Sequence, residues 1–574
     1  MRYSKLFLAS ALVVMAAGGI SLAQAQVYGP DKMETMNSVY PIGPYDAPAY
    51  GNKTGVNVVK VANSYLGGIA LDAGGNVFTW GWNGQGQLGI GKTDSYLPGK
   101  GTPKELISAL AWTAQTYGGG YTPVDFFSNP GNYAANYAAM GIAPELTQPT
   151  TIVDVGAGYH HMLALDNQGR VWAWGYNLDG QVGKSSASGP LNKYNFPQRV
   201  QGLPANIVKV WGNNGYLDRG QSFALTSDGQ LWSWGSNLNG KQGVGTLTIT
   251  PDYQATPRQA IFPAGTVIVD VQGGDYHNIA LDDQGNVWVW GYGGAGLMGD
   301  GAYNTYTTPH LLPRPAGMGK AVKISNSYDN SLVLDENHVV WQWGYLYVGP
   351  GAGNLTIART PRQVDFEPAE VARVGYVPVA QDVAAGESVS YFIDQYGRSW
   401  AWGDNRYFGF GREGGYEDSN NIITTKAYQY PQIIGDGDTQ IYDKDPKTPA
   451  DGRVRNATYG TYGFNELHPT IYDDKYNVTA SVEEWKNLAF KPIPKIRQMI
   501  GSRSSYIILD YDGNIFKWAN DGSGTIAWGN GDYFDKKYDF TGNGRDGTYD
   551  AYCYEVMIMR NGGGQPPCLG NRCP

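Results

Sequence analysis

The sequence is poor in charge, and this scarcity excludes one large class of partners. Only 16% of its 574 residues are charged, and 51 acidic side chains outnumber 42 basic ones, which leaves a formal net charge of −9. A surface that binds nucleic acid needs a stripe of Lys and Arg to contact phosphates, and the sequence contains no such stripe. We therefore expect no nucleic-acid partner.

Cysteine and histidine are also scarce. The only three cysteines, Cys553, Cys568 and Cys573, lie within the last 22 residues, and the six histidines form no helical i,i+4 pair. Neither a zinc site nor a haem-attachment motif fits these residues. In an oxidising compartment Cys568 and Cys573 could close a small disulfide loop and leave Cys553 odd, but spacing alone leaves the connectivity open.

Long hydrophobic runs are missing after the first 25 residues. Residues 1–25 have a basic start, an apolar run from Leu6 to Ile20, and the small-residue site Ala23-Gln24-Ala25. This order is typical of a cleaved secretory signal peptide, and the run is shorter than the roughly 20 residues that span a bilayer. We expect an exported chain, periplasmic, at the cell surface or extracellular, with no integral membrane span after cleavage.

Glycine and aromatic residues, in contrast, are abundant, with 80 glycines and 13% aromatic side chains. Many of them belong to a sequence motif that occurs seven times. The motif consists of an apolar strand, a turn with Asp or Gln and Gly, a second strand that ends in Trp-Gly, and a glycine-rich loop. The clearest copies span residues 70–91, 164–183, 224–245 and 280–301, and weaker ones span 333–353, 392–411 and 508–529. The anchoring tryptophans are Trp80, Trp174, Trp234, Trp290, Trp343, Trp402 and Trp518.

The repeats predict an all-β fold, a seven-bladed β-propeller of four-stranded blades. Their length of roughly 50 to 60 residues is the range of propeller blades, and their alternation of apolar and polar residues is strand periodicity. Pieces of the form Pro-x-x-apolar, each followed by a Val/Ile-rich run, supply the other two strands of each blade. They lie at residues 197–200, 257–260, 361–364 and 431–434.

The repeats resemble those of the regulator of chromosome condensation family. The resemblance is carried by Gly158 to Leu165 with His161, Gly274 to Leu281 with His277, Trp80-Gly81-Trp82-Asn83 and Gly86-Gln87-Leu88-Gly89. It implies a seven-bladed propeller whose uses are mostly in binding: nucleotide exchange on a nuclear GTPase with chromatin docking, ubiquitin-ligase adaptors, and a secreted bacterial inhibitor of β-lactamases. With the export signal, we expect a secreted member of bacterial type.

Two spacings between tryptophans are too long for one blade and predict two long loop insertions, at about 92–149 and 412–494. Both are rich in Tyr, which gives a large contact area for few rotatable bonds, and loops on a rigid scaffold often bind partners. We take them as candidate recognition elements, and the alternative is that they only cap the ring. The expected organisation is a signal peptide at 1–25, an N-terminal extension at 26–55, the propeller at 56–560 and a Cys-containing tail at 561–574.

A segment near the C-terminus resembles a calcium-binding loop. Oxygen-bearing residues stand at the first, third, fifth and twelfth loop positions, Gly544 stands at the sixth, and a backbone carbonyl is available at the seventh. The alternative is a polar turn between strands. The candidate metal ligands are Asp539, Thr541, Asn543, Arg545 and Asp550. No cofactor is required by the sequence, and calcium is the one candidate.

The strand candidate from Tyr552 to Met559 could complete a blade shared with the N-terminal copy and so join the first and last blades. No GxSxG, P-loop or HExxH motif occurs, and His161 and His277 recur at one repeat position, which favours a structural role. We expect no enzyme. A glycoside hydrolase is the alternative, because its two carboxylates can lie far apart in sequence.

These observations predict an exported, non-catalytic propeller that binds another protein through its loops and insertions. Two alternatives stay open: a carbohydrate-binding or glycan-active propeller, and a structural or adhesive subunit of a cell-surface assembly. A glycan binder should be retained on glycans, whereas a structural subunit should self-associate.

Overall fold

A computed structural model gives the fold of the repeats. The residues that it describes are 58–64, 67–81, 83–91, 122–184, 193–213, 220–247, 253–328, 330–347, 355–386, 389–395, 399–404, 416–417, 423–424, 427–433, 496–501, 505–510, 515–519 and 554–559.

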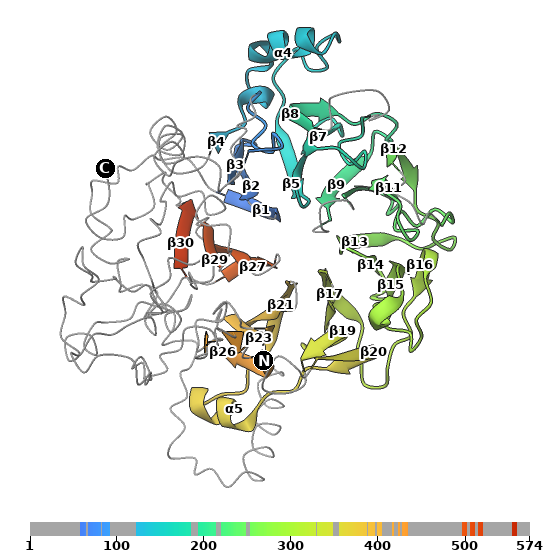
Figure 1. Ribbon diagram of the computed structural model, residues 1–574, viewed down its shortest axis with the longest axis vertical. Coiled ribbons are helices and arrows are strands. Elements are labelled where there is room, and N and C mark those ends of the chain that lie inside the picture. The colour runs from blue at the N-terminus through green and yellow to red at the C-terminus, as the bar shows by residue number, and fades with distance from the viewer. Residues whose placement is uncertain are drawn as a thin grey trace, which may run out of the picture.

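Seven four-stranded antiparallel sheets are arranged as blades around a central axis, with the first strand of each blade innermost (Figure 1). The expected fold class is confirmed. Blades 1 to 3 consist of β1 (Val58–Ser64), β2 (Gly67–Asp72), β3 (Val77–Gly81) and β4 (Thr122–Pro123); β5 (Ile152–Ala157), β6 (His161–Asp166), β7 (Val171–Tyr176) and β8 (Lys193–Arg199); and β9 (Ile207–Gly212), β10 (Gln221–Thr226), β11 (Leu231–Ser236) and β12 (Tyr253–Gln259).

The other four blades follow the same order. They consist of β13 (Ile268–Gly273), β14 (His277–Asp282), β15 (Val287–Gly291) and β16 (Tyr306–Leu311); β17 (Ala321–Asn326), β18 (Asn330–Asp335), β19 (Val340–Tyr347) and β20 (Leu355–Gln363); β21 (Ala380–Ala385), β22 (Val389–Asp394), β23 (Ser399–Asp404) and β26 (Ala427–Ile433); and β27 (Ile496–Gly501), β28 (Ser505–Asp510), β29 (Ile515–Ala519) and β30 (Tyr554–Met559).

Short helices and one small hairpin lie in the connections. The helices are η3 (Asp125–Phe127), η4 (Pro130–Tyr133), α4 (Ala134–Ala139), η5 (Gly294–Gly296) and α5 (Pro368–Val374), and the hairpin pairs β24 (Tyr416–Glu417) with β25 (Ile423–Thr424). The Pro-x-x pieces fall in the outermost strands, as expected. In β12, for example, the register shifts between Gln254 and Arg258, so Pro257 lies at a bulge where no ladder N–H is needed.

The Asp residues of the hairpin turns are structural. Asp166 Oδ1 accepts the backbone N–H groups of Gln168 and Arg170, both at 3.0 Å, and its Oδ2 accepts Trp172 Nε1–H at 3.0 Å. The equivalent Asp282 bonds Trp288 in the same way. Each carboxylate thus closes its own turn and orients an aromatic side chain.

The Trp-Gly anchors join neighbouring blades. Trp234 is fully buried and donates its indole N–H to the carbonyl of Gln181 in the preceding blade, at 2.9 Å. Trp174 bonds Gln87 O in the same manner. The following glycine is required because Gly235 has φ +96° and a Cβ there would lie 2.3 Å from Gly220 O.

The blade that contains β27 is completed by β30, which pairs with β29. All four strands of this blade therefore come from the C-terminal part of the chain, and the expectation of a blade shared with the N-terminal copy is wrong. Within the described residues the ring closes instead by packing, because β1 lies against β27 and β28.

Candidate functional site

Several residues predicted to have a function lie outside the described part of the chain. These are the signal peptide, the calcium-loop candidates Asp539, Thr541, Asn543, Arg545 and Asp550, and the cysteines Cys553, Cys568 and Cys573. Of the second insertion, predicted at 412–494, only 416–417, 423–424 and 427–433 are described, and β26 within it is a strand of blade 6. The calcium loop and the disulfide stay predictions. Among the described residues no group of three or more His, Cys, Asp or Glu side chains could hold a metal ion, and no helix is long and apolar enough to cross a membrane.

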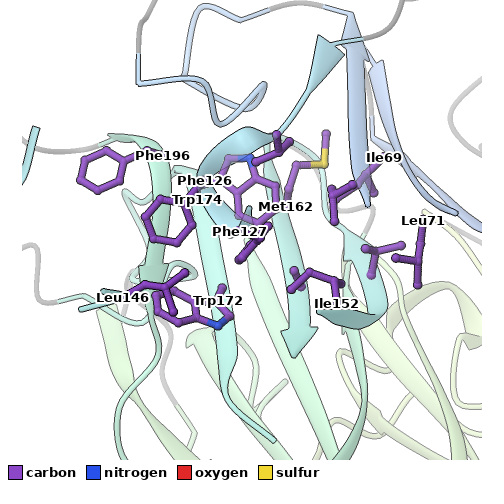
Figure 2. Packing of buried hydrophobic residues seen from close by; sticks show 14 of the residues in the cluster. Ile69, Leu71, Phe126, Phe127, Leu146, Ile152, Met162, Trp172, Trp174 and Phe196 are labelled. Atoms are coloured by element: carbon purple, nitrogen blue, oxygen red, sulfur yellow. The ribbon is translucent and has the colours of Figure 1, made fainter. Parts of the chain in front are cut away.

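In the described part of the first insertion the large aromatic side chains are buried, whereas many of the other residues are exposed. Phe126 and Tyr137 are fully buried, and Phe126 packs edge-on against Trp172 of blade 2 with ring centroids 5.4 Å apart. Tyr133 is also buried, and its hydroxyl donates to Asp125 Oδ1 at 2.6 Å. Figure 2 shows this cluster around the tryptophans of blade 2. Tyr133 and Tyr137 are therefore too buried to contact a partner, and the insertion as a recognition element stays a prediction that its other, exposed residues would have to carry.

The two histidines at the equivalent repeat position join blades. His161 Nε2 lies 2.9 Å from Ser222 Oγ of the next blade, and His277 Nε2 lies 2.7 Å from Ser331 Oγ of the next. Both rings are fully buried, and this burial lowers the pKa of each imidazole to about 3. They are neutral structural side chains at ordinary pH.

Tyrosines gather on one face of the propeller, in the loops after the innermost strand and after the third strand of a blade. Tyr276 precedes β14, Tyr328 precedes β18, and Tyr292 follows β15. The hydroxyls of Tyr276 and Tyr328 lie 3.0 Å apart, and the Tyr276 ring lies 5.2 Å from the Tyr328 ring and 5.7 Å from the Tyr292 ring. We call these three residues the tyrosine cluster.

The tyrosine cluster is partly open to solvent. Tyr292 is 41% exposed, whereas Tyr276 and Tyr328 are half-buried. In blade 2 the loop at the same place holds Tyr159 and His160, whose rings lie 4.4 Å apart, and the His160 ring lies 6.3 Å from that of Tyr176. Tyr159 and His160 are buried, so this loop does not extend the tyrosine cluster as an open surface.

The loop that carries Tyr276 is held from both sides. The buried Lys241 of blade 3 donates to the carbonyl of Asp275 at 2.8 Å, and Asn213 of the same blade donates to the Gly274 carbonyl at 3.2 Å. From blade 5, Asn326 donates to the His277 carbonyl at 2.9 Å. These hydrogen bonds hold the loop of Tyr276 in place, and a loop ordered in advance would lose less entropy in any binding event.

The tyrosine cluster was not among the residues predicted from sequence to bind, although a signal for it exists. A tyrosine occurs in the loop before the second strand in five of the seven repeats. These residues are Tyr65, Tyr159, Tyr216, Tyr276 and Tyr328. Aligning the loops as well as the strands would have found this pattern.

Comparisons with known proteins agree with the fold. Models of the regulator of chromosome condensation (RCC1) repeat match residues 74–122, 152–181, 168–212, 228–281 and 268–296. The human E3 ubiquitin-protein ligase HERC2 is 28% identical over 387 residues, which cover 63% of this chain and 7% of that protein. The ultraviolet-B receptor UVR8 of Arabidopsis thaliana is 28% identical over 274 residues, 45% of this chain and 58% of the receptor.

This chain thus spans less than two thirds of either relative's length. Among solved structures, Prp20p from Saccharomyces cerevisiae, described with its binding properties to Gsp1p and histones, has a TM-score of 0.51 at 16% identity and covers 86% of this chain and 87% of its own. The chain therefore carries regulator of chromosome condensation repeats, folded as a β-propeller of that kind.

Proposed function

We propose that this chain is an exported, non-catalytic propeller scaffold that binds another protein through the face that carries the tyrosine cluster. The observation that carries the proposal is the contact of Tyr276, Tyr292 and Tyr328 on loops anchored by buried polar side chains. Tyrosine is favoured at protein interfaces because it buries a large area and loses few rotamers, and a few such aromatics normally carry most of the binding energy.

The chemistry of the described residues supports a binding role rather than catalysis. The repeated turn carboxylates accept backbone and indole N–H groups, and the two recurrent histidines are buried between blades. The solved relative Prp20p is described by its binding to other proteins. The export part of the proposal rests on the sequence of residues 1–25, and it gives a periplasmic, cell-surface or extracellular place of action.

The test is capture of a partner by the chain from Gln26 onward, from the envelope and medium of the source organism, followed by measurement of its Kd. Tyr292→Ala should weaken binding at least tenfold, since truncation of a central aromatic costs more than about 1.4 kcal/mol. The matched control is Tyr303→Ala, because Tyr303 is 54% exposed and stacks on Arg359 instead of joining the tyrosine cluster.

Equal Kd values for both variants and the parent chain would contradict a role for the tyrosine cluster. Retention on glycans without a protein would favour the carbohydrate-binding alternative, and recovery of this chain alone would favour the structural one.

A further inference from the structure

The innermost strands carry a pattern of charge that runs around the propeller. Each strand has a bulge after its first residue, and the residue that follows the bulge lies at the same place in every blade. In chain order from blade 1 to blade 7, these residues are Lys60, Asp154, Lys209, Asp270, Lys323, Asp382 and Gln498. We call them the axial ring. Basic and acidic residues alternate through six blades, and the seventh is neutral.

Every lysine of the axial ring reaches the following blade. Lys60 forms an ion pair with Asp154, and Lys323 Nζ lies 2.9 Å from Asp382 Oδ1. Lys209 Nζ donates at 3.0 Å to the carbonyl of Val269, the residue before Asp270. These contacts join blade 1 to 2, 3 to 4, and 5 to 6.

Asp154 extends its contact in the other direction as well. Its Oδ2 accepts the backbone N–H of Val210 in blade 3 at 2.9 Å. One carboxylate thus contacts the inner strands on both sides of its own. This places the axial ring at the innermost seam between blades, where the strands converge in Figure 1.

The charges of the axial ring act on one another across several blades. Burial raises the pKa of Asp270, while Lys323, Lys209 and Lys60 oppose that rise. Burial also acts to lower the pKa of Lys323, but the carboxylates of Asp382 and Asp270 raise it above its usual value. The lysines that oppose the rise for Asp270 include Lys60 of blade 1, so the charges of the axial ring act beyond the pairs that contact each other.

An odd number of blades makes complete alternation impossible. In a ring of seven charges two neighbours must have the same sign, and like charges in a partly buried site repel. Gln498 stands where that conflict would arise, between Asp382 of blade 6 and Lys60 of blade 1. We propose that the axial ring is an electrostatic lock that fixes the order of the inner strands, with Gln498 as the neutral position that lets a seven-membered ring close.

The experiment measures the melting temperature of the whole chain at about 20 mM and about 1 M salt. Lys323→Asp replaces an ion pair by three successive carboxylates, so we expect it to melt about 5 °C or more below the parent in low salt and to recover part of that loss in high salt. Lys323→Asp with Asp382→Lys restores one pair and should melt above Lys323→Asp alone. The control Lys320→Asp makes the same charge change at an exposed site and should have little effect.

Substitutions of Gln498 test whether the seventh position of the axial ring has to be neutral. Each lysine of the axial ring reaches the following blade, so Gln498→Lys would face Lys60, whereas Gln498→Glu would follow Asp382 and find Lys60 already paired with Asp154. The like-charge neighbour should therefore outweigh the opposite one, and both variants should lower the melting temperature in low salt. A rise with either one would contradict the neutral seventh position. The electrostatic lock would be contradicted by equal melting temperatures of Lys323→Asp and Lys320→Asp. It would also be contradicted if the variant with both Lys323→Asp and Asp382→Lys melted no higher than Lys323→Asp alone. If Lys323→Asp does not fold, Lys323→Gln should show a smaller loss of the same sign and salt dependence.

Discussion

Tyrosine occurs in two regions of this molecule with opposite environments. In residues 122–149, Tyr133 and Tyr137 are buried among Phe126, Trp172 and neighbouring aromatics. In the loops before β14 and β18, Tyr276 and Tyr328 reach the surface beside the exposed Tyr292. A tyrosine-rich composition therefore does not separate buried from partly exposed side chains. The position in the fold matters for these residues, but it is not sufficient, because Tyr159 turns at the end of an inner strand and is buried.

The largest expected effect comes from the buried region. Phe126→Ala should lower the free energy of unfolding by about 3–5 kcal/mol, because it empties a fully buried site against Trp172. Denaturant unfolding measures the loss. Ile142→Ala, at an exposed residue of the same segment, should cost less than about 0.5 kcal/mol. Similar costs for the two variants would mean that the segment does not belong to the core.

A second prediction concerns His277, which lies in the core directly after the surface residue Tyr276. The pKa of His277 is about 3 when folded and 6.5 when unfolded, so the unfolded chain binds the proton first. The contribution of neutral His277 to the free energy of unfolding is fully present above pH 6.5 and is lost as pH falls toward 3. His277→Gln should destabilise the chain at pH 7, and its penalty should shrink between pH 6.5 and pH 4.

Thermal melting over that pH range checks this prediction. Ser331→Ala removes the hydrogen-bond partner of His277 but keeps the imidazole, so its penalty should not shrink in the same way. A His277→Gln penalty that is constant from pH 7 to pH 4 would be inconsistent with a buried neutral imidazole.

The smallest effect is expected inside the tyrosine cluster. Tyr276→Phe and Tyr328→Phe each remove one member of the 3.0 Å hydroxyl contact, and each should cost about 0.5–1.5 kcal/mol. A double-mutant cycle measured by denaturant unfolding should show coupling between them. Additive costs would show that the two hydroxyls do not stabilise each other.

The repeat pattern was sufficient to predict the fold because strand periodicity, turn glycines and the Trp-Gly anchor all have direct physical causes. Gly235 needs positive φ, and Trp234 needs a carbonyl from the preceding blade, so the sequence records both requirements. The Pro-x-x pieces were located correctly for the same reason, because Pro257 fits a bulge of an outermost strand.

The candidate site could not be predicted as well, because burial is a property of tertiary packing. Nothing in the local sequence of Tyr137 shows that blade 2 covers it, and following Trp-Gly does not fix the place of Tyr292 either, because Tyr345 also follows Trp-Gly but lies inside β19. The axial ring was equally hidden, since Lys60 and Asp154 are 94 residues apart and meet only when the blades close.

Hydrogen exchange of the chain with and without its captured partner distinguishes binding through the tyrosine cluster from binding elsewhere. We expect the partner to slow exchange in the loops at 274–276, 292–294 and 327–328 and to leave residues 130–137 unchanged. Protection confined to residues 122–149, or to the turns on the opposite face such as 283–286, would contradict binding through the tyrosine cluster.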